Sequence, residues 1–98
     1  MAQVDVTFVD ARTVVVQPSG RLDEDTGREL LRAVATAVSN RVPRLLVDLG
    51  AIRSYTEEAI VAVTGCRRLA QRYPERVTVM ARGGSGALAL VRSCVTVP

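Results

Sequence analysis

The fold of this chain is decided by the segment RLLVDLG at residues 44–50. Leu or Val occupies four of the six positions from 44 to 49, and Pro43 and Gly50 flank the run. A short apolar run between residues that break secondary structure predicts a buried strand near the centre of a sheet. The next residues, AIRSYTEE at 51–58, predict a short loop that leads from this strand into a helix.

The period of the apolar residues changes after this loop. Small and apolar side chains recur every three or four positions, which predicts a buried stripe on a helix that ends near Tyr73 and Pro74. The stripe consists of Ala59, Ala62, Val63, Cys66, Leu69, Ala70 and Tyr73. The turn before the helix faces outward, where free backbone N–H groups and the helix dipole favour an interaction.

The remaining segments predict further strands and helices in alternation. Val4, Val6 and Phe8 alternate with polar residues, which predicts a first strand with one buried face. A breaker group at residues 18–20, Pro-Ser-Gly, predicts the end of the second strand. In order, the predicted elements are strands at about 3–9 and 13–17, a helix that follows the acidic segment 21–27 and closes at 39–43, a strand at 44–49, a helix from about 57 to 73, a strand at 77–81, a helix at 87–92 and a short strand at 95–97.

This β-β-α-β-α-β-α-β order predicts one α/β domain over residues 1–98. We expect a mixed sheet that is parallel at its centre, with an antiparallel hairpin at its N-terminal end. The helices are expected to pack on the sheet through the apolar stripes that they carry.

The composition excludes several kinds of chemistry. All 13 basic residues are Arg, and the absence of Lys and His removes lysine nucleophiles, Schiff bases and imidazole acid–base catalysis. The only cysteines, Cys66 and Cys94, cannot form a zinc site without His. They are most simply small buried apolar residues, and a disulfide switch stays open as an alternative. We therefore expect a protein that is not an enzyme and that binds no cofactor or metal.

The charge and hydropathy patterns bear on partners and location. The net charge is +3, but the Arg residues are scattered among ten acidic residues, so nucleic acid is not an expected partner. No apolar run approaches ~20 residues, and the first residues lack the basic and apolar parts of a signal peptide. We expect a cytoplasmic protein without direct membrane insertion.

Two polar motifs at turns before helices allow both a chemical and a structural interpretation. Glu57 and Glu58 are adjacent in a first helical turn, where successive side chains point about 100° apart and do not converge on one substrate atom. Their charges suit the positive end of the helix dipole instead. The segment GGSG at 83–86 lacks the lysine and the spacing of phosphate-binding loops, which favours a tight turn and a helix cap.

The start of the second helix has two candidate caps. Thr56 is the favoured N-cap, because this choice makes Tyr55 and Ile60 a hydrophobic staple. Ser54 with Glu57 would form a capping box instead. Either choice leaves residues 54–58 exposed at the end of the sheet.

Two segments resemble those of the STAS domains of bacterial anti-sigma factor antagonists. GRLDEDT at 20–26 precedes a helix, and LLVDL at 45–49 leads through a loop into an apolar helix. The resemblance covers almost the whole chain and implies a STAS-like (SpoIIAA-like) mixed β-sheet. It also implies a regulator of transcription whose partner kinase, itself the anti-sigma factor, phosphorylates a Ser or Thr at the start of the second helix.

The resemblance implies a degenerate phosphorylation motif in this chain. An alignment without gaps over residues 45–68 puts Thr56 at the Asp of the family, Glu57 at its phosphoacceptor, Glu58 at the next Ser or Thr and Ala59 at its Gly. Thr56 is the only hydroxyl left within the motif and is the candidate for phosphorylation. Two interpretations remain: Glu57 is phosphomimetic, or the domain has left phosphoregulation and binds constitutively, which is favoured because a carboxylate has less charge and fewer oxygens than a phosphate.

The same resemblance implies a protein–protein interaction as the function. The expected partner is an anti-sigma factor of the histidine-kinase-like ATPase type, or another STAS or regulatory protein, and a homodimer is a further option. The alternative function is that of a small STAS accessory subunit of an ABC-type lipid or anion transport system. The expected partner-binding residues are Asp23, Asp25, Ser54, Tyr55, Thr56, Glu57 and Glu58.

Overall fold

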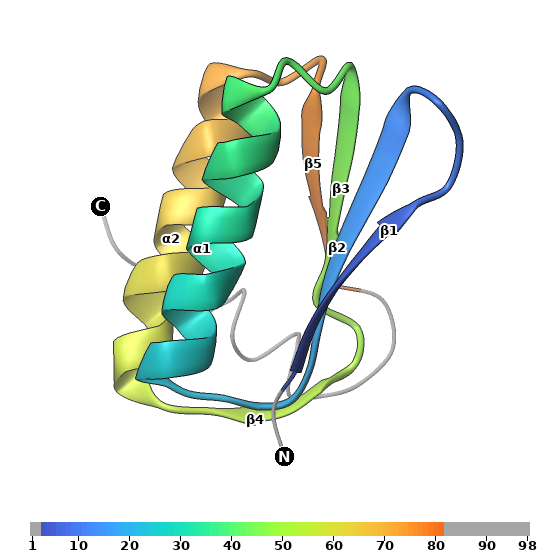
Figure 1. Ribbon diagram of the computed structural model, residues 1–98. Helices are drawn as coiled ribbons and strands as arrows, with labels where there is room; N and C mark the ends of the chain where they lie inside the picture. Colours follow the sequence, from blue (N-terminus) through green and yellow to red (C-terminus); the bar gives the residue numbers. More distant parts are fainter. Residues whose placement is uncertain (1–2, 82–98) are drawn as a thin grey trace.

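The computed structural model describes residues 3–81 of the chain, which form two helices and a mixed sheet (Figure 1). The elements are β1 (Gln3–Phe8), β2 (Thr13–Leu22), α1 (Glu24–Ser39), β3 (Arg44–Asp48), β4 (Ile52–Tyr55), α2 (Glu57–Arg72) and β5 (Val77–Met80). The predicted loop at 83–86, helix at 87–92 and strand at 95–97 lie outside the described residues, as does Cys94. No helix within residues 3–81 has both the length and the apolar character that crossing a membrane requires.

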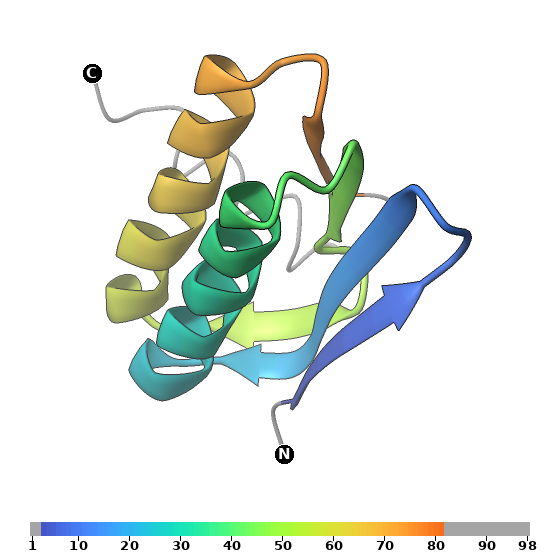
Figure 2. The same cartoon turned by 45° about the horizontal axis from the view of Figure 1, so that its top comes forward.

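The sheet confirms the predicted hairpin and parallel centre. Its strand order is β1-β2-β3-β5, in which β1 and β2 are antiparallel while β2, β3 and β5 are parallel. Both helices cover the same face of this sheet and lie side by side (Figures 1 and 2). The predicted α/β architecture is therefore confirmed over the part of the chain that the structure describes.

The core forms where the predicted apolar stripes meet the sheet. Val16 and Val47 from the central strands are completely buried, and so are Leu30 of α1 and Val63 of α2. Each buried side chain of this size contributes about 1.5–3 kcal/mol through removal of apolar surface from water. Cys66 is buried in the same core, which agrees with its interpretation as a small apolar residue.

The predicted end of the second strand at residues 18–20 is wrong, because β2 continues to Leu22. Pro18 is buried within the strand and pairs with Val4 of β1. The parallel pairing with β3 ends at Val16 and the pairing with β4 begins at Gly20, so Pro18 lies in a gap where no parallel neighbour needs its missing N–H group.

The predicted loop at residues 51–58 is also wrong in part, because its centre forms the strand β4. This strand pairs in parallel with the end of β2, which bends at Gly20, a residue with a φ of +79°. Only Ile52 in β4 is fully buried, whereas Arg53 and Ser54 are exposed. A four-residue strand with one buried side chain has no alternation that a sequence pattern can reveal.

The first strand forms as predicted, but the prediction that its apolar face is buried is wrong. Val4 is half-buried against the core, whereas Val6 is 51% exposed and Phe8 is 73% exposed. β1 is an edge strand, and its far end extends beyond the cover of α1 (Figure 2). An apolar strand face is buried only where another layer lies over it.

Candidate functional site

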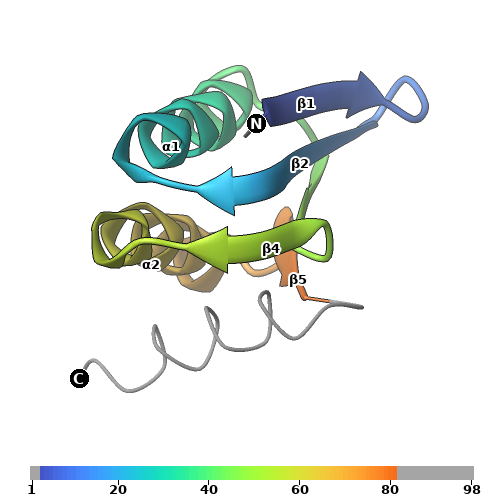
Figure 3. The same ribbon diagram turned by 90° about the horizontal axis from the view of Figure 1, so that it is seen from below.

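The two predicted parts of the binding surface come together at one edge of the molecule. Leu22 pairs with Tyr55 across β2 and β4, and the Thr56 N–H donates to the Leu22 carbonyl at 3.0 Å. The chain enters α1 directly after β2 and α2 directly after β4, so the two helices start next to each other (Figure 3). Segments about thirty residues apart in sequence therefore form one surface.

Gly27 allows the starts of the helices to approach closely. A Cβ atom on Gly27 would lie 3.1 Å from the Ala62 Cβ and 3.6 Å from the Ala59 Cα. Gly27 is buried in the first turns of α1, facing residues of the first turns of α2. Small residues at this crossing hold the acidic first turns of the two helices together.

α1 begins with a complete cap. The Asp23 Oδ1 atom accepts a hydrogen bond from the Thr26 N–H at 2.9 Å, and the Asp23 carbonyl accepts one from the Gly27 N–H at 2.8 Å. The bond from the Thr26 N–H holds the pKa of the Asp23 carboxyl below its usual value. Asp23 therefore supports the fold as an N-cap, in addition to its predicted place on the binding surface.

α2 begins without a side-chain cap. Thr56 occupies the N-cap position with extended backbone, as predicted, but its side chain makes no capping hydrogen bond. Its Oγ1 atom is buried and has no hydrogen-bond partner within residues 3–81. The alternative capping box is wrong, because Ser54 lies in β4 rather than at the helix start.

The carboxylates of the two first turns lie exposed around this junction. Glu57 and Glu58 of α2 are exposed, and so is Asp25 of α1. Glu24 is also exposed and forms an ion pair with Arg28 one turn later. All these charges lie at the positive ends of two helix dipoles, which stabilises them without an external partner. The result is an acidic surface over both helix starts.

Sequence reasoning missed the basic side of the same surface. Arg21 and Arg53 are exposed and lie on paired strands, where they line an open hollow of about 540 Å³ together with Ser54. The two guanidinium groups therefore border the acidic helix starts on the sheet side. The sequence pattern gave little indication of this basic border, because Arg53 lies beside Arg21 only through the pairing of β4 with β2, which was not predicted.

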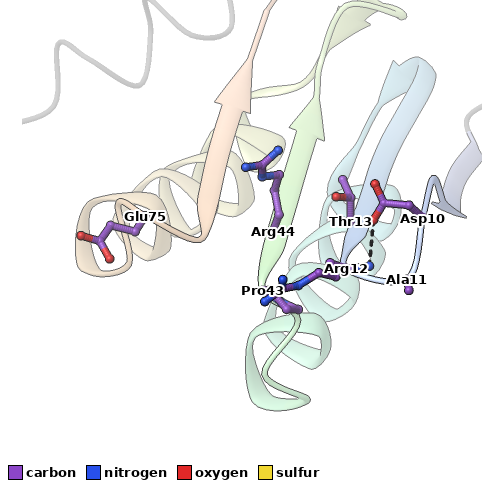
Figure 4. Close-up of a pocket in the computed structure, with 7 residues that line it drawn as sticks. All are labelled: Asp10, Ala11, Arg12, Thr13, Pro43, Arg44 and Glu75. Carbon is purple, nitrogen blue, oxygen red and sulfur yellow. Dashed lines mark hydrogen bonds between the residues drawn. The ribbon is translucent and has the colours of Figure 1, made fainter.

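A second open hollow lies at the opposite end of the sheet, where the parallel strands begin (Figure 4). It has a volume of about 580 Å³ and includes the acidic residues Asp10 and Glu75 and the basic residues Arg12 and Arg44. The backbone N–H of Arg12 donates to the Asp10 Oδ1 at 2.8 Å. This hydrogen bond is the main cause of the lowered pKa of the Asp10 carboxyl. Equal numbers of opposite charges give this hollow no preference for an anion or a cation.

No group of three or more Cys, Asp and Glu side chains within residues 3–81 is placed to hold a metal ion. The acidic helix starts are a surface of separate exposed carboxylates.

No model of a known protein family matches this sequence, and no curated protein matches it. Solved structures do match its fold. SpoIIAA, an anti-sigma factor antagonist and Bacillus cell fate determinant, is similar in two forms. The phosphorylated form has a TM-score of 0.69 at 17% identity, covering 96% of this chain and 84% of SpoIIAA, and the unphosphorylated form has a TM-score of 0.61 at 18% identity, covering 79% and 71%.

An anti-sigma factor antagonist from Mycobacterium paratuberculosis is similar as well. The TM-score is 0.66 at 23% identity, and the match covers 95% of this chain and 77% of the other. At sequence identities this low, the similarity establishes the fold alone. The chain has the STAS fold of the anti-sigma factor antagonists.

Proposed function

We propose that this chain is a non-enzymatic regulatory module that binds a protein partner through its two helix starts. The observation that carries the proposal is the pairing of β2 with β4, which brings both predicted binding segments to one exposed edge. We call this edge the motif surface. It consists of Asp23, Asp25, Ser54, Tyr55, Thr56, Glu57 and Glu58.

The chemistry of the motif surface favours constitutive binding. Glu57 stands where the resemblance places the phosphoacceptor, and both Glu57 and Glu58 expose carboxylates there. A carboxylate carries one negative charge, whereas a phosphate carries about −1.5 to −2 and three acceptor oxygens. Thr56 remains the candidate hydroxyl for modification, but its buried Oγ1 atom would reach a kinase only after the turn opened. With no hydroxyl at position 57 and the Thr56 hydroxyl buried, the module binds in one fixed state.

The partner that we propose is an anti-sigma factor of the histidine-kinase-like ATPase type, in the cytoplasm. Exposed carboxylates over two helix starts suit a partner surface that presents Arg or Lys to them. Arg21 and Arg53 at the border would meet acidic groups of that same partner. This mixed charge pattern favours one orientation of the partner over others.

The direct test is co-purification of the full chain from its native cytoplasm, followed by identification of the partner and intact-mass analysis of the chain. Recovery of a sigma-regulating kinase is the expected result. Recovery of the nucleotide-binding component of an ABC transporter, with no kinase, would overturn this proposal in favour of the accessory-subunit alternative.

The role of the carboxylates is tested by calorimetry with the recovered partner. The double change Glu57→Gln and Glu58→Gln should weaken binding by at least about tenfold, because it removes two charges from the centre of the motif surface. Glu75→Gln, an exposed carboxylate at the opposite end of the sheet, is the matched control and should leave the affinity unchanged. Equal affinities for all three proteins would show that the partner binds elsewhere.

The substitution Glu57→Ser distinguishes the phosphomimetic interpretation of Glu57 from constitutive binding. If Glu57 imitates a phosphorylated residue, Glu57→Ser should make the chain a substrate of the partner kinase and change its affinity. Under constitutive binding, which we favour, Glu57→Ser has no effect beyond the loss of charge that Glu57→Gln also causes. Mass spectrometry after incubation with the kinase and ATP measures the difference.

A further inference from the structure

A separate surface along β1 has no part in the proposed function. Within residues 3–81, β1 pairs with β2 alone, and no other described strand lies along the second side of its backbone. Val6 is 51% exposed and Phe8 is 73% exposed on this strand, and Val9 just beyond it is 62% exposed. An open strand edge beside exposed apolar side chains is a site at which another strand can pair.

The same residues border a groove between β1 and α1. Val6 and Phe8 form one wall of this groove of about 340 Å³, and Glu29 and Arg32 on α1 border its other side. The one ion pair within residues 3–81 joins Glu24 and Arg28, so neither Glu29 nor Arg32 has an ionic partner among these residues. The groove is therefore apolar at its floor and carries one charge of each sign on its rim.

We propose that this surface binds a second copy of the same chain, as a twofold dimer in which the two β1 strands pair in antiparallel orientation. A pairing centred on Val6 places Val6 opposite its own copy and Val4 opposite Phe8 on the helix-covered face. The same pairing places Asp5 opposite Thr7 on the other face, so no like charges meet directly. The strand is self-complementary in this pairing.

The charges on α1 favour a second copy over a different partner. A twofold axis through the paired strands keeps both α1 helices on the same face of the joined sheet and makes them antiparallel. Glu29 of each copy then faces Arg32 of the other, which gives each charge a partner that residues 3–81 of its own chain do not provide. The axis also reverses the strand direction, so the two motif surfaces point to opposite ends of the dimer and both stay free.

The oligomeric state of the full chain tests this dimer, with sedimentation measured over a series of concentrations. The wild-type chain should sediment as a dimer, and Val6→Lys should weaken the dimer by roughly thirtyfold or more, as expected for a residue at the centre of an interface. Thr7→Lys is the matched control, since it adds the same charge to the same strand on the opposite face, next to Asp5 of the other copy. A wild-type monomer at every concentration would overturn the proposal, and so would equal effects of Val6→Lys and Thr7→Lys.

A charge exchange tests the arrangement of the helices. Glu29→Arg and Arg32→Glu should each weaken the dimer, because like charges then face each other, and the double variant should regain the affinity of the wild type. Restored affinity in the double variant is the result expected if Glu29 of one copy meets Arg32 of the other. Thermal unfolding of each variant checks that it folds, which is expected because both residues are exposed. A double variant that stays as weak as the single ones would overturn the proposed pairing.

Discussion

The two helices begin side by side, but their starts are held in different ways. At α1, Asp23 caps the first turn through a hydrogen bond to the Thr26 N–H. At α2, the Thr56 hydroxyl is buried without a partner among the described residues. The turn is stabilised instead by contacts with residues outside the helix. The Thr56 N–H donates to Leu22, and Ile52 just before the turn is completely buried. α1 is thus fixed by its own side chain, whereas α2 is fixed by the pairing of β4 with β2.

The difference indicates which carboxylates are available to a partner. The Asp23 carboxylate is engaged in the cap, so a partner would have to share it. No hydrogen bond or ion pair within residues 3–81 involves the side chains of Glu57 or Glu58. A helix start that needs no cap of its own leaves its polar side chains free for recognition.

The largest expected effect comes from separating the two helix starts. Gly27→Leu should lower the free energy of unfolding by about 2 kcal/mol, because the added side chain has no space against Ala62 and the backbone of Ala59. Urea unfolding measures this change. Gly27→Ala is the control: its contact with Ala62 is tight, but alanine favours the helix by about 1 kcal/mol, so its net effect should be small. Equal stability of Gly27→Leu and the wild type would contradict the close approach.

The second-largest expected effect distinguishes the capped start of α1 from the start of α2, which has no side-chain cap. Asp23→Ala should lower the Tm by about 4–8 °C, because the Thr26 N–H loses its acceptor. Thermal unfolding followed by circular dichroism is the measurement. An unchanged Tm would show that α1, like α2, is held by the sheet rather than by its cap.

The difference in Tm between the wild type and Asp23→Ala should change with pH in a definite direction. The pKa of Asp23 is lowered in the folded chain, so its contribution is complete above the usual Asp value of about 3.9 and is lost as the pH falls through the lower folded value. The gap in Tm between the wild type and Asp23→Ala should be constant near neutral pH and close in acid. Asp10, whose pKa is also lowered, is present in both proteins and does not affect the gap. A gap that widened in acid would contradict the assignment.

The smallest expected effect on stability is neutral or stabilising, in contrast to the losses expected above. Thr56→Val should leave stability unchanged or raise it by up to about 1 kcal/mol, because it removes a buried hydroxyl that has no partner while keeping the shape of the side chain. Thr26→Val is the matched control at α1, where the hydroxyl helps to lower the pKa of the capping carboxyl of Asp23, so its loss should destabilise. Urea unfolding of both variants gives the comparison. Similar losses in the two would mean that the Thr56 hydroxyl is engaged after all.

The sequence patterns were reliable where burial is periodic over many residues. The apolar stripe from Ala59 to Cys66 and the run at Leu45–Leu49 are found as a helix and a central strand, because both are buried over their length. The patterns failed where a neighbour decides the outcome. Pro18 continues a strand because its neighbours change at that point, and Phe8 stays exposed because α1 does not extend over it.

By itself the sequence determined the type and order of most elements and the position of Thr56 at the start of α2. These features depend on residues within one or two helical turns or along one strand, so their cause is local. Only the tertiary structure decided that β4 is a strand, that Arg21 and Arg53 border the acidic turn, and that the two helix starts form one surface. Each of these follows from a pairing between segments about thirty residues apart, and the free energy of such pairing is invisible to any local pattern.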